Sequence, residues 1–169
     1  GSASPDRDAL MDVVVRESDR LNSIISDFLA YARPQPENIP IKVSKVDAGE
    51  AVNDCLALMK HDPAVREEHV FKFTNPNPPV IVETDEVHIK QVIWNLLRNS
   101  IHAMPEGGTL SVTLDEPNPG FARMVFTDNG CGIDRAGLKN LYEPFQSGAH
   151  GTGLGLSIVH RIVTEGGGR

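Results

Sequence analysis

The sequence predicts an α/β fold of the α+β sandwich kind, in which helices pack on one face of a mixed β-sheet. Along most of the chain, segments in which apolar and polar residues alternate, as in strands, are interleaved with segments of helical periodicity. Hydrophobic residues make up 40% of the 169 residues, which is enough for a buried core. A mixed sheet covered by helices on one face would bury all of these apolar surfaces.

One amphipathic helix precedes this domain. Apolar residues recur every three or four positions over residues 10–32, and two prolines end the pattern. The following stretch, residues 34–40, is predicted to be a linker. We therefore divide the chain into three parts: residues 1–33, the linker of residues 34–40, and a domain over residues 41–169. The first part begins with a cloning remnant and contains the helix. The helix must bury its apolar stripe on the rest of this chain or against a partner helix.

Beyond the linker, strands and helices are predicted in alternation. Strands are expected at residues 41–46, 70–74 and 80–82, followed by a hairpin of strands 110–114 and 123–127. Helices are expected at residues 48–61, 85–104 and 154–165. Asp85 is placed to cap the longest of these helices. Residues 128–152 are expected to form a loop-rich stretch.

Composition excludes several classes of protein. The net charge of −7 and the lack of a Lys/Arg run argue against nucleic-acid binding. Cys55 and Cys131 lie far apart with no metal-binding spacing, as expected for reduced, uninvolved cysteines of a cytosolic protein. No apolar run approaches the ~18 residues of a membrane span. We expect a cytoplasmic domain, whose parent protein could be anchored in the inner membrane.

A pair of asparagines on the longest helix is the first candidate site. Asn95 and Asn99 are four positions apart and therefore lie on one face. Asparagine is a poor helix former, so two of them within an apolar helix suggest a function. Their amide oxygens are hard, neutral ligands that suit a Mg²⁺ ion shared with phosphates. The alternative is a pair of polar residues that pack against loops.

The second candidate site directly follows a predicted strand. Asp128 begins the run Asp-Asn-Gly-Cys-Gly, in which Gly130 and Gly132 allow a tight turn and the close approach of a flat ring. The Asp128 carboxylate could accept a hydrogen bond from an adenine amino group. The alternative is an ordinary turn, since Asp-Asn-Gly is common turn chemistry.

The third candidate site is the run Gly-Thr-Gly-Leu-Gly-Leu, residues 151–156, which opens the last helix. Flexible backbone at a helix N-terminus offers free N–H groups and a favourable dipole to phosphate. A loose loop before a helix is the alternative. The run matches neither a Walker motif nor a dinucleotide-binding fingerprint. Between the second and third sites, residues 141–150 suit a hinged lid.

Taken together, these segments resemble a known family. In their order they are similar to the N, G1, F and G2 boxes of the histidine-kinase branch of the ATPase superfamily that includes gyrase, the heat-shock chaperone ATPases and the mismatch-repair ATPases. Residues 17–34 resemble the end of the second dimerisation-and-phosphotransfer helix of such kinases. The resemblance covers nearly the whole chain beyond the linker. It implies a Bergerat-type ATP-binding fold with ATP and Mg²⁺ as cofactors.

The resemblance also implies roles for single residues. Asn95 and Asn99 would contact Mg²⁺ and the phosphates, and Asp128 would bind the adenine amine beside Gly130 and Gly132. His102 lies where many relatives carry a basic residue facing phosphate, although a solvated helix histidine is an equal alternative. The glycines of the last run would let the lid close and present amides to the phosphates, with nucleotide contacts expected at Gly151, Thr152, Gly153, Leu154 and Gly155.

Asn95 separates the branches of the superfamily. The gyrase-type and chaperone-type relatives carry there a Glu that activates water, a role that an amide cannot take. The resemblance therefore implies transfer of the ATP γ-phosphoryl group to a histidine, with the acceptor helix of the same kinase in a homodimer and a response regulator receiver domain as partners. The rival interpretations are a water-activating ATPase of the same fold and a nucleotide-binding scaffold without kinase activity.

Three features depart from the family pattern. None of the six histidines has the surroundings of an acceptor, and all lie beyond the linker, so we expect the acceptor histidine to be absent from this chain. Relatives often carry threonines and a lysine in the lid where this chain has residues 146–150, which leaves His150 as the substitute for a phosphate-facing cation. The chain ends with residues 166–169, where relatives continue into a last hairpin whose loss would expose a sheet edge.

Overall fold

The computed structural model describes residues 42–76, 78–144 and 153–169, together with residues 10, 11, 13–15, 18 and 21. These N-terminal residues are helical, in agreement with the predicted helix. The rest of that helix and the whole predicted linker, residues 34–40, lie outside the described residues. The chain forms two compact units, Gly1–Glu37 and Asn38–Arg169.

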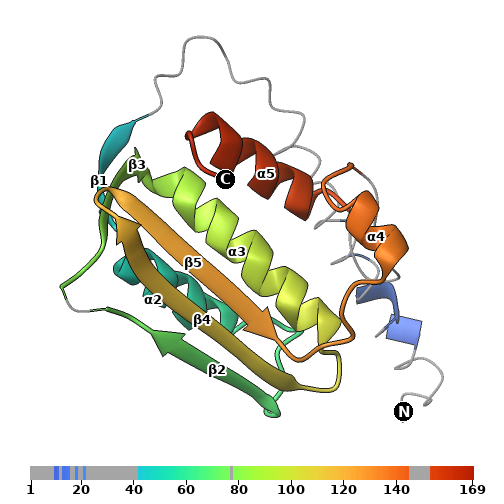
Figure 1. The fold of residues 1–169 in the computed structure, drawn as a ribbon. Coiled ribbons are helices and arrows are strands. Elements are labelled where there is room, and N and C mark those ends of the chain that lie inside the picture. Colours follow the sequence, from blue (N-terminus) through green and yellow to red (C-terminus); the bar gives the residue numbers. More distant parts are fainter. Residues whose placement is uncertain are drawn as a thin grey trace. The chain divides into compact units, whose positions relative to one another are not determined.

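The second unit contains all the labelled elements of Figure 1. In chain order they are β1 (Val43–Asp47), α2 (Ala48–Met59), β2 (His69–Thr74), β3 (Ile81–Asp85), α3 (Glu86–Ala103), β4 (Gly108–Asn118), β5 (Phe121–Asp128), α4 (Arg135–Lys139) and α5 (Gly155–Glu165). β1 and β3 pair antiparallel as a two-stranded sheet. In the second sheet β4 lies between β2, its parallel neighbour, and β5, its antiparallel neighbour. The predicted mixed sheet with helices is confirmed, with its strands paired as two sheets among the described residues.

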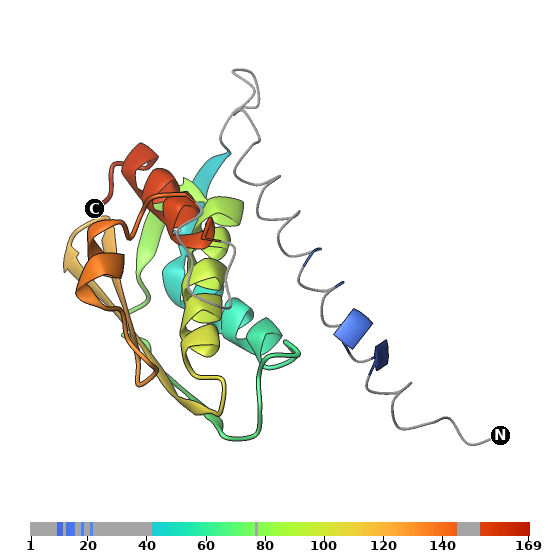
Figure 2. The ribbon, with the colours of Figure 1, turned by 90° about the vertical axis from the view of Figure 1, so that its right-hand side faces the viewer.

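The main core lies between α2, α3 and the three-stranded sheet, and Figure 2 shows both helices on the same side of that sheet. Along β4, Leu110, Val112 and Leu114 are buried while the residues between them are not, as expected for a strand covered on one face. Complete burial of a large apolar side chain contributes about 1.5–3 kcal/mol. The largest fully buried side chains include Met59, Ile93, Leu97, Ile101 and Leu110.

The helix α3 is fixed at both ends. The Asp85 carboxylate caps its N-terminus by accepting a hydrogen bond from the Val87 N–H at 2.8 Å, as predicted. Burial of the carboxyl group raises the pKa of Asp85, but the hydrogen bonds from the N–H groups of Val87 and His88 lower it. The pKa of Asp85 therefore lies below its usual value. After the C-terminus, the buried His69 accepts the Arg66 N–H at Nδ1 (2.9 Å), so its Nε2 can donate to the Met104 carbonyl at 2.9 Å.

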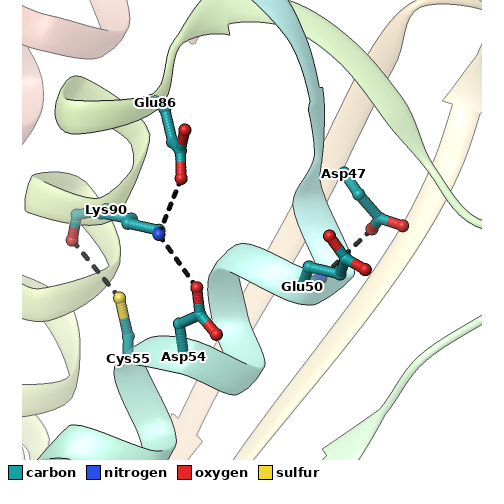
Figure 3. A network of polar contacts seen from close by, with 6 residues as sticks. All are labelled: Asp47, Glu50, Asp54, Cys55, Glu86 and Lys90. Carbon is teal, nitrogen blue, oxygen red and sulfur yellow. Dashed lines mark hydrogen bonds and ion pairs between the residues drawn. The ribbon is translucent and has the colours of Figure 1, made fainter.

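A lysine joins α3 to α2 on the surface (Figure 3). The Lys90 ammonium donates to Glu86 Oε1 at 2.8 Å and to Asp54 Oδ2 at 2.9 Å, and these bonds raise the pKa of Lys90. One position further on α2, the Cys55 thiol lies 3.7 Å from the Lys90 carbonyl oxygen. Burial raises the pKa of the Cys55 thiol, so this cysteine is a packing residue and not a nucleophile.

Two predicted boundaries differ from the structure. The β4–β5 hairpin is confirmed, but its strands run much further than residues 110–114 and 123–127, with an irregular register between Asp115 and Asn118. Gly120 adopts a φ of +80°, which permits a tight connection over residues 119–120 instead of the longer one predicted. The stretch expected to be loop contains α4, whose N-cap Asp134 accepts the Gly137 N–H at 2.7 Å. Among the described residues no helix has the length and apolar character needed to cross a membrane.

Candidate functional site

The two predicted asparagines lie on one face of α3. Asn95 is 8% exposed, and its Nδ2 donates to the Gln91 carbonyl oxygen at 3.0 Å. This bond fixes the amide plane and directs the Oδ1 atom away from the helix backbone. Asn99, one turn further along, is exposed. Because the Asn95 side-chain NH₂ group donates to its own helix, its oxygen can accept a hydrogen bond or bind a metal ion outside the helix.

The first residue of α5 lies against these asparagines. A Cβ atom built on Gly155 would be 3.2 Å from Asn95 Oδ1 and 3.7 Å from Asn99 Oδ1, so both amide oxygens face the same point. Among the described residues, the N-cap residue of α5, Leu154, makes no side-chain capping hydrogen bond to the first turn of the helix. Two predicted segments that are about sixty positions apart in the sequence therefore meet here.

The Asp128 segment packs on the C-terminal end of the same helix. The Cys131 N–H donates to the Ala103 carbonyl oxygen at 3.0 Å. A Cβ on Gly130 would lie 2.5 Å from that oxygen, so only glycine allows this approach. The exposed Asp128 carboxylate accepts the Gly130 N–H through Oδ1 at 3.0 Å, which is the predicted turn chemistry. Gly132 has a φ of +70° and open space around it.

The site is therefore elongated along α3. Ala103 lies eight positions after Asn95, which is about 12 Å at the rise of an α-helix. Amide oxygens and a helix N-terminus lie at one end, and a carboxylate with its glycine turn lies at the other. His102 is half-buried in the last turn of α3, next to Ala103 at the second of these ends. A ligand that contacts both ends must be long, with groups for a metal or phosphate at one end and a hydrogen-bond donor at the other.

Part of the predicted site cannot be placed in this geometry. Gly151 and Thr152 lie outside the described residues, as do residues 145–150 of the predicted lid. Gly153 adopts a φ of +70°, and Leu154 is buried as the N-cap of α5. Sequence reasoning missed one contact: the Tyr142 and His160 rings lie 4.6 Å apart, which joins the segment after α4 to α5. No sequence pattern links residues so far apart.

In the described part of the chain, no three His, Cys, Asp or Glu side chains cluster in a way that could hold a metal ion. The amide oxygens of Asn95 and Asn99 are the described groups that converge on one point at the N-terminus of a helix.

Comparisons with known proteins agree with this arrangement. Residues 84–169 match the family model described as histidine kinase-, DNA gyrase B-, and HSP90-like ATPase. Over 160 residues, 94% of the chain, the sequence is 35% identical to the sensor histidine kinase ZraS of Escherichia coli O157:H7. The chain spans 34% of that protein, or about a third of the length of the relatives it matches.

Solved structures have the same fold. A mycobacterial sensor histidine kinase, MprB, is 30% identical, with a TM-score of 0.66 over 74% of this chain and 80% of that one. The histidine kinase ThkA in complex with the response regulator protein TrrA has a TM-score of 0.76, covering 99% of this chain and 47% of that chain. At 24% identity, the second comparison shows the fold alone.

The family match begins at residue 84, near the end of β3, and includes every described element of the elongated site. The long helix with its asparagines, the aspartate turn after β5 and the glycine-led helix α5 all fall within it. The chain therefore belongs to the family of histidine kinase-, DNA gyrase B- and HSP90-like ATPases, and it carries the ATP-binding catalytic domain of a sensor histidine kinase.

Proposed function

We propose that this chain binds Mg²⁺-ATP along α3 and transfers the terminal phosphoryl group to a histidine on an acceptor helix of a sensor kinase. The adenine would lie at the Asp128 end, where the carboxylate can accept a hydrogen bond from its amino group. The phosphates would lie about 12 Å away, at the N-terminus of α5. Glycines at 151 and 153 would let the intervening lid approach the nucleotide.

The described residues fit a magnesium ion at the phosphate end. Asn95 and Asn99 present two neutral, hard oxygens beside Gly155, at the start of α5. Two amide ligands without a carboxylate suit a cation whose other ligands are phosphate oxygens and water. When bound, the metal would supply charge neutralisation for phosphoryl transfer. The protein's own contribution would be to orient the triphosphate and to exclude water.

The observation that carries this proposal is the amide at position 95. Asn95 is buried, faces the start of α5, and cannot take a proton from water. A site that holds ATP without a general base for water needs another nucleophile. A histidine nitrogen on an acceptor helix would serve, because placing it in line with the phosphate can contribute about 7–11 kcal/mol.

We further propose that residues 41–169 are the catalytic domain and that residues 10–32 belong to the dimerisation helix. The described N-terminal residues include exposed apolar side chains, among them Leu10, Val14 and Leu21, which suit packing against a second helix. In the full-length kinase, the helix of residues 10–32 and the second helix would together form the acceptor helix pair of the homodimer. We also propose a response regulator as the protein that next receives the phosphoryl group, by analogy with the histidine kinase ThkA, which was solved in complex with the response regulator protein TrrA.

Incubation with γ-labelled Mg²⁺-ATP tests this proposal. We expect no phosphohistidine on this chain alone, slow release of inorganic phosphate, and label on an acceptor helix pair when one is added. Asn95→Ala should reduce that labelling, while a surface change such as Lys139→Ala should not. Rapid phosphate release would indicate the water-activating ATPase, and absence of ATP binding would indicate the scaffold. Label on any of the chain's own histidines would refute the proposed acceptor.

A further inference from the structure

The side chain of Asn129 continues the sheet at the point where β5 ends. The paired register of β4 and β5 ends at Leu110 and Asp128. One position further, the backbone leaves the sheet, and the Asn129 Oδ1 atom accepts the Thr109 N–H at 2.8 Å. The side chain thus takes the place of a backbone partner and ties the loop after β5 to the start of β4.

This contact depends on a glycine in the neighbouring strand. A Cβ on Gly108 would lie 2.5 Å from Asn129 Oδ1 and 2.5 Å from Met104 Sδ. Any other residue at 108 would therefore push the Asn129 amide away from Thr109. The absence of a side chain at position 108 therefore leaves the space that the Asn129 amide occupies.

The loop is held a second time, two residues later. The Cys131 N–H bonds to the Ala103 carbonyl at the end of α3, so Asn129 and Cys131 fix the loop on both sides of Gly130. The Gly130 N–H in turn donates to Asp128 Oδ1, so the direction of the carboxylate follows the loop backbone. If the Asn129–Thr109 hydrogen bond is lost, the loop backbone can move, and the Asp128 carboxylate that is bonded to this backbone changes its direction with it.

We propose that Asn129 is a positioning residue for nucleotide binding: its side-chain oxygen fixes the loop that presents the Asp128 carboxylate. This inference rests on the proposed adenine-binding role of Asp128. The Asn129–Thr109 bond is exposed and lies outside the core clusters. Its loss should therefore change ligand affinity more than the stability of the fold.

Two substitutions of similar size separate the oxygen from the shape of the side chain. Asn129→Asp keeps an acceptor for the Thr109 N–H, whereas Asn129→Leu removes it. We expect ATP affinity, measured by calorimetric titration, to fall about three- to tenfold in Asn129→Leu, as for one lost hydrogen bond, and to recover in Asn129→Asp. Gly108→Ala should also weaken binding, because its methyl group displaces an intact Asn129.

A thiol reagent gives a readout that does not depend on the nucleotide. Cys131 is exposed and Cys55 is buried, so alkylation of the folded, nucleotide-free chain should report on the loop. We expect faster alkylation of Cys131 in Asn129→Leu than in Asn129→Asp, with equal thermal midpoints. Equal ATP affinity in wild type, Asn129→Leu and Asn129→Asp would overturn the proposal, and so would an equal loss in both variants. Unchanged binding by Asp128→Ala would instead overturn the adenine-binding role.

Discussion

Gly155→Ala should separate nucleotide binding from the stability of the domain. Gly155 is the first residue of α5 and faces the amides of Asn95 and Asn99. Its φ is not in the left-handed region, so alanine fits the backbone. Replacing glycine by alanine in a helix stabilises it by at most about 1 kcal/mol, and less in the first turn. The thermal midpoint should therefore stay the same or rise slightly.

The added methyl group would change the proposed metal and phosphate end. It would lie 3.2 Å from Asn95 Oδ1, closer than ordinary contact, and 3.7 Å from Asn99 Oδ1. The Asn95 amide could yield only by stretching or breaking its bond to the Gln91 carbonyl. If one contact to a charged ligand is lost, the cost is about 1.5–3 kcal/mol. This corresponds to about a 10- to 150-fold weaker affinity for Mg²⁺-ATP.

Calorimetric titration with Mg²⁺-ATP and with adenosine would measure the effect, and thermal unfolding would measure stability. Adenosine binding should change little, because the methyl group lies at the opposite end of the site from Asp128. Gly166→Ala is a matched control: it lies at the other end of α5, and its Cβ would also meet an oxygen at 3.2 Å, the Ile162 carbonyl. An unchanged Mg²⁺-ATP affinity in a folded Gly155→Ala protein would show that the phosphates bind elsewhere.

Two further predictions concern single carboxylates. Asp85→Ala should destabilise the domain by about 0.5–2 kcal/mol at neutral pH by removing the cap of α3, whereas Asp85→Asn should keep the cap. Because the folded pKa of Asp85 is lowered from 3.8, its charge-dependent stabilisation is present above that value and disappears as the pH falls through the folded pKa. Urea unfolding over this acid range should show a steeper loss of stability for wild type than for Asp85→Asn, and parallel curves would contradict the cap's charge dependence. For the nucleotide, wild type should prefer ATP to GTP by about tenfold because the guanine carbonyl would face the Asp128 carboxylate, and Asp128→Ala should bind ATP weakly. Equal titration of ATP and GTP by wild type would refute this role of Asp128.

Much of the fold could be predicted because it depends on local patterns. Periodicity of two or about 3.6 residues identified the strands and helices of the second unit, and Asp85 was identifiable as a cap from its position before an apolar run. The five-residue helix α4 was too short to show a periodic pattern. The length of the β4–β5 hairpin depended on Gly120. Because this glycine allows a tight turn, pairing between the two strands extends to Asn118 and Phe121.

For the candidate site, the sequence alone determined which residue types occur and in what order, and so the family and the amide at position 95. Only the tertiary structure decided how they meet. Gly155 faces Asn95 because α5 packs on α3, and Gly130 must be glycine because the loop after β5 touches Ala103. The bond from Thr109 to Asn129 spans twenty positions and leaves no periodic trace. Such contacts follow from the packing of whole elements against a shared core, and the packing of elements is not encoded in the spacing of neighbouring residues.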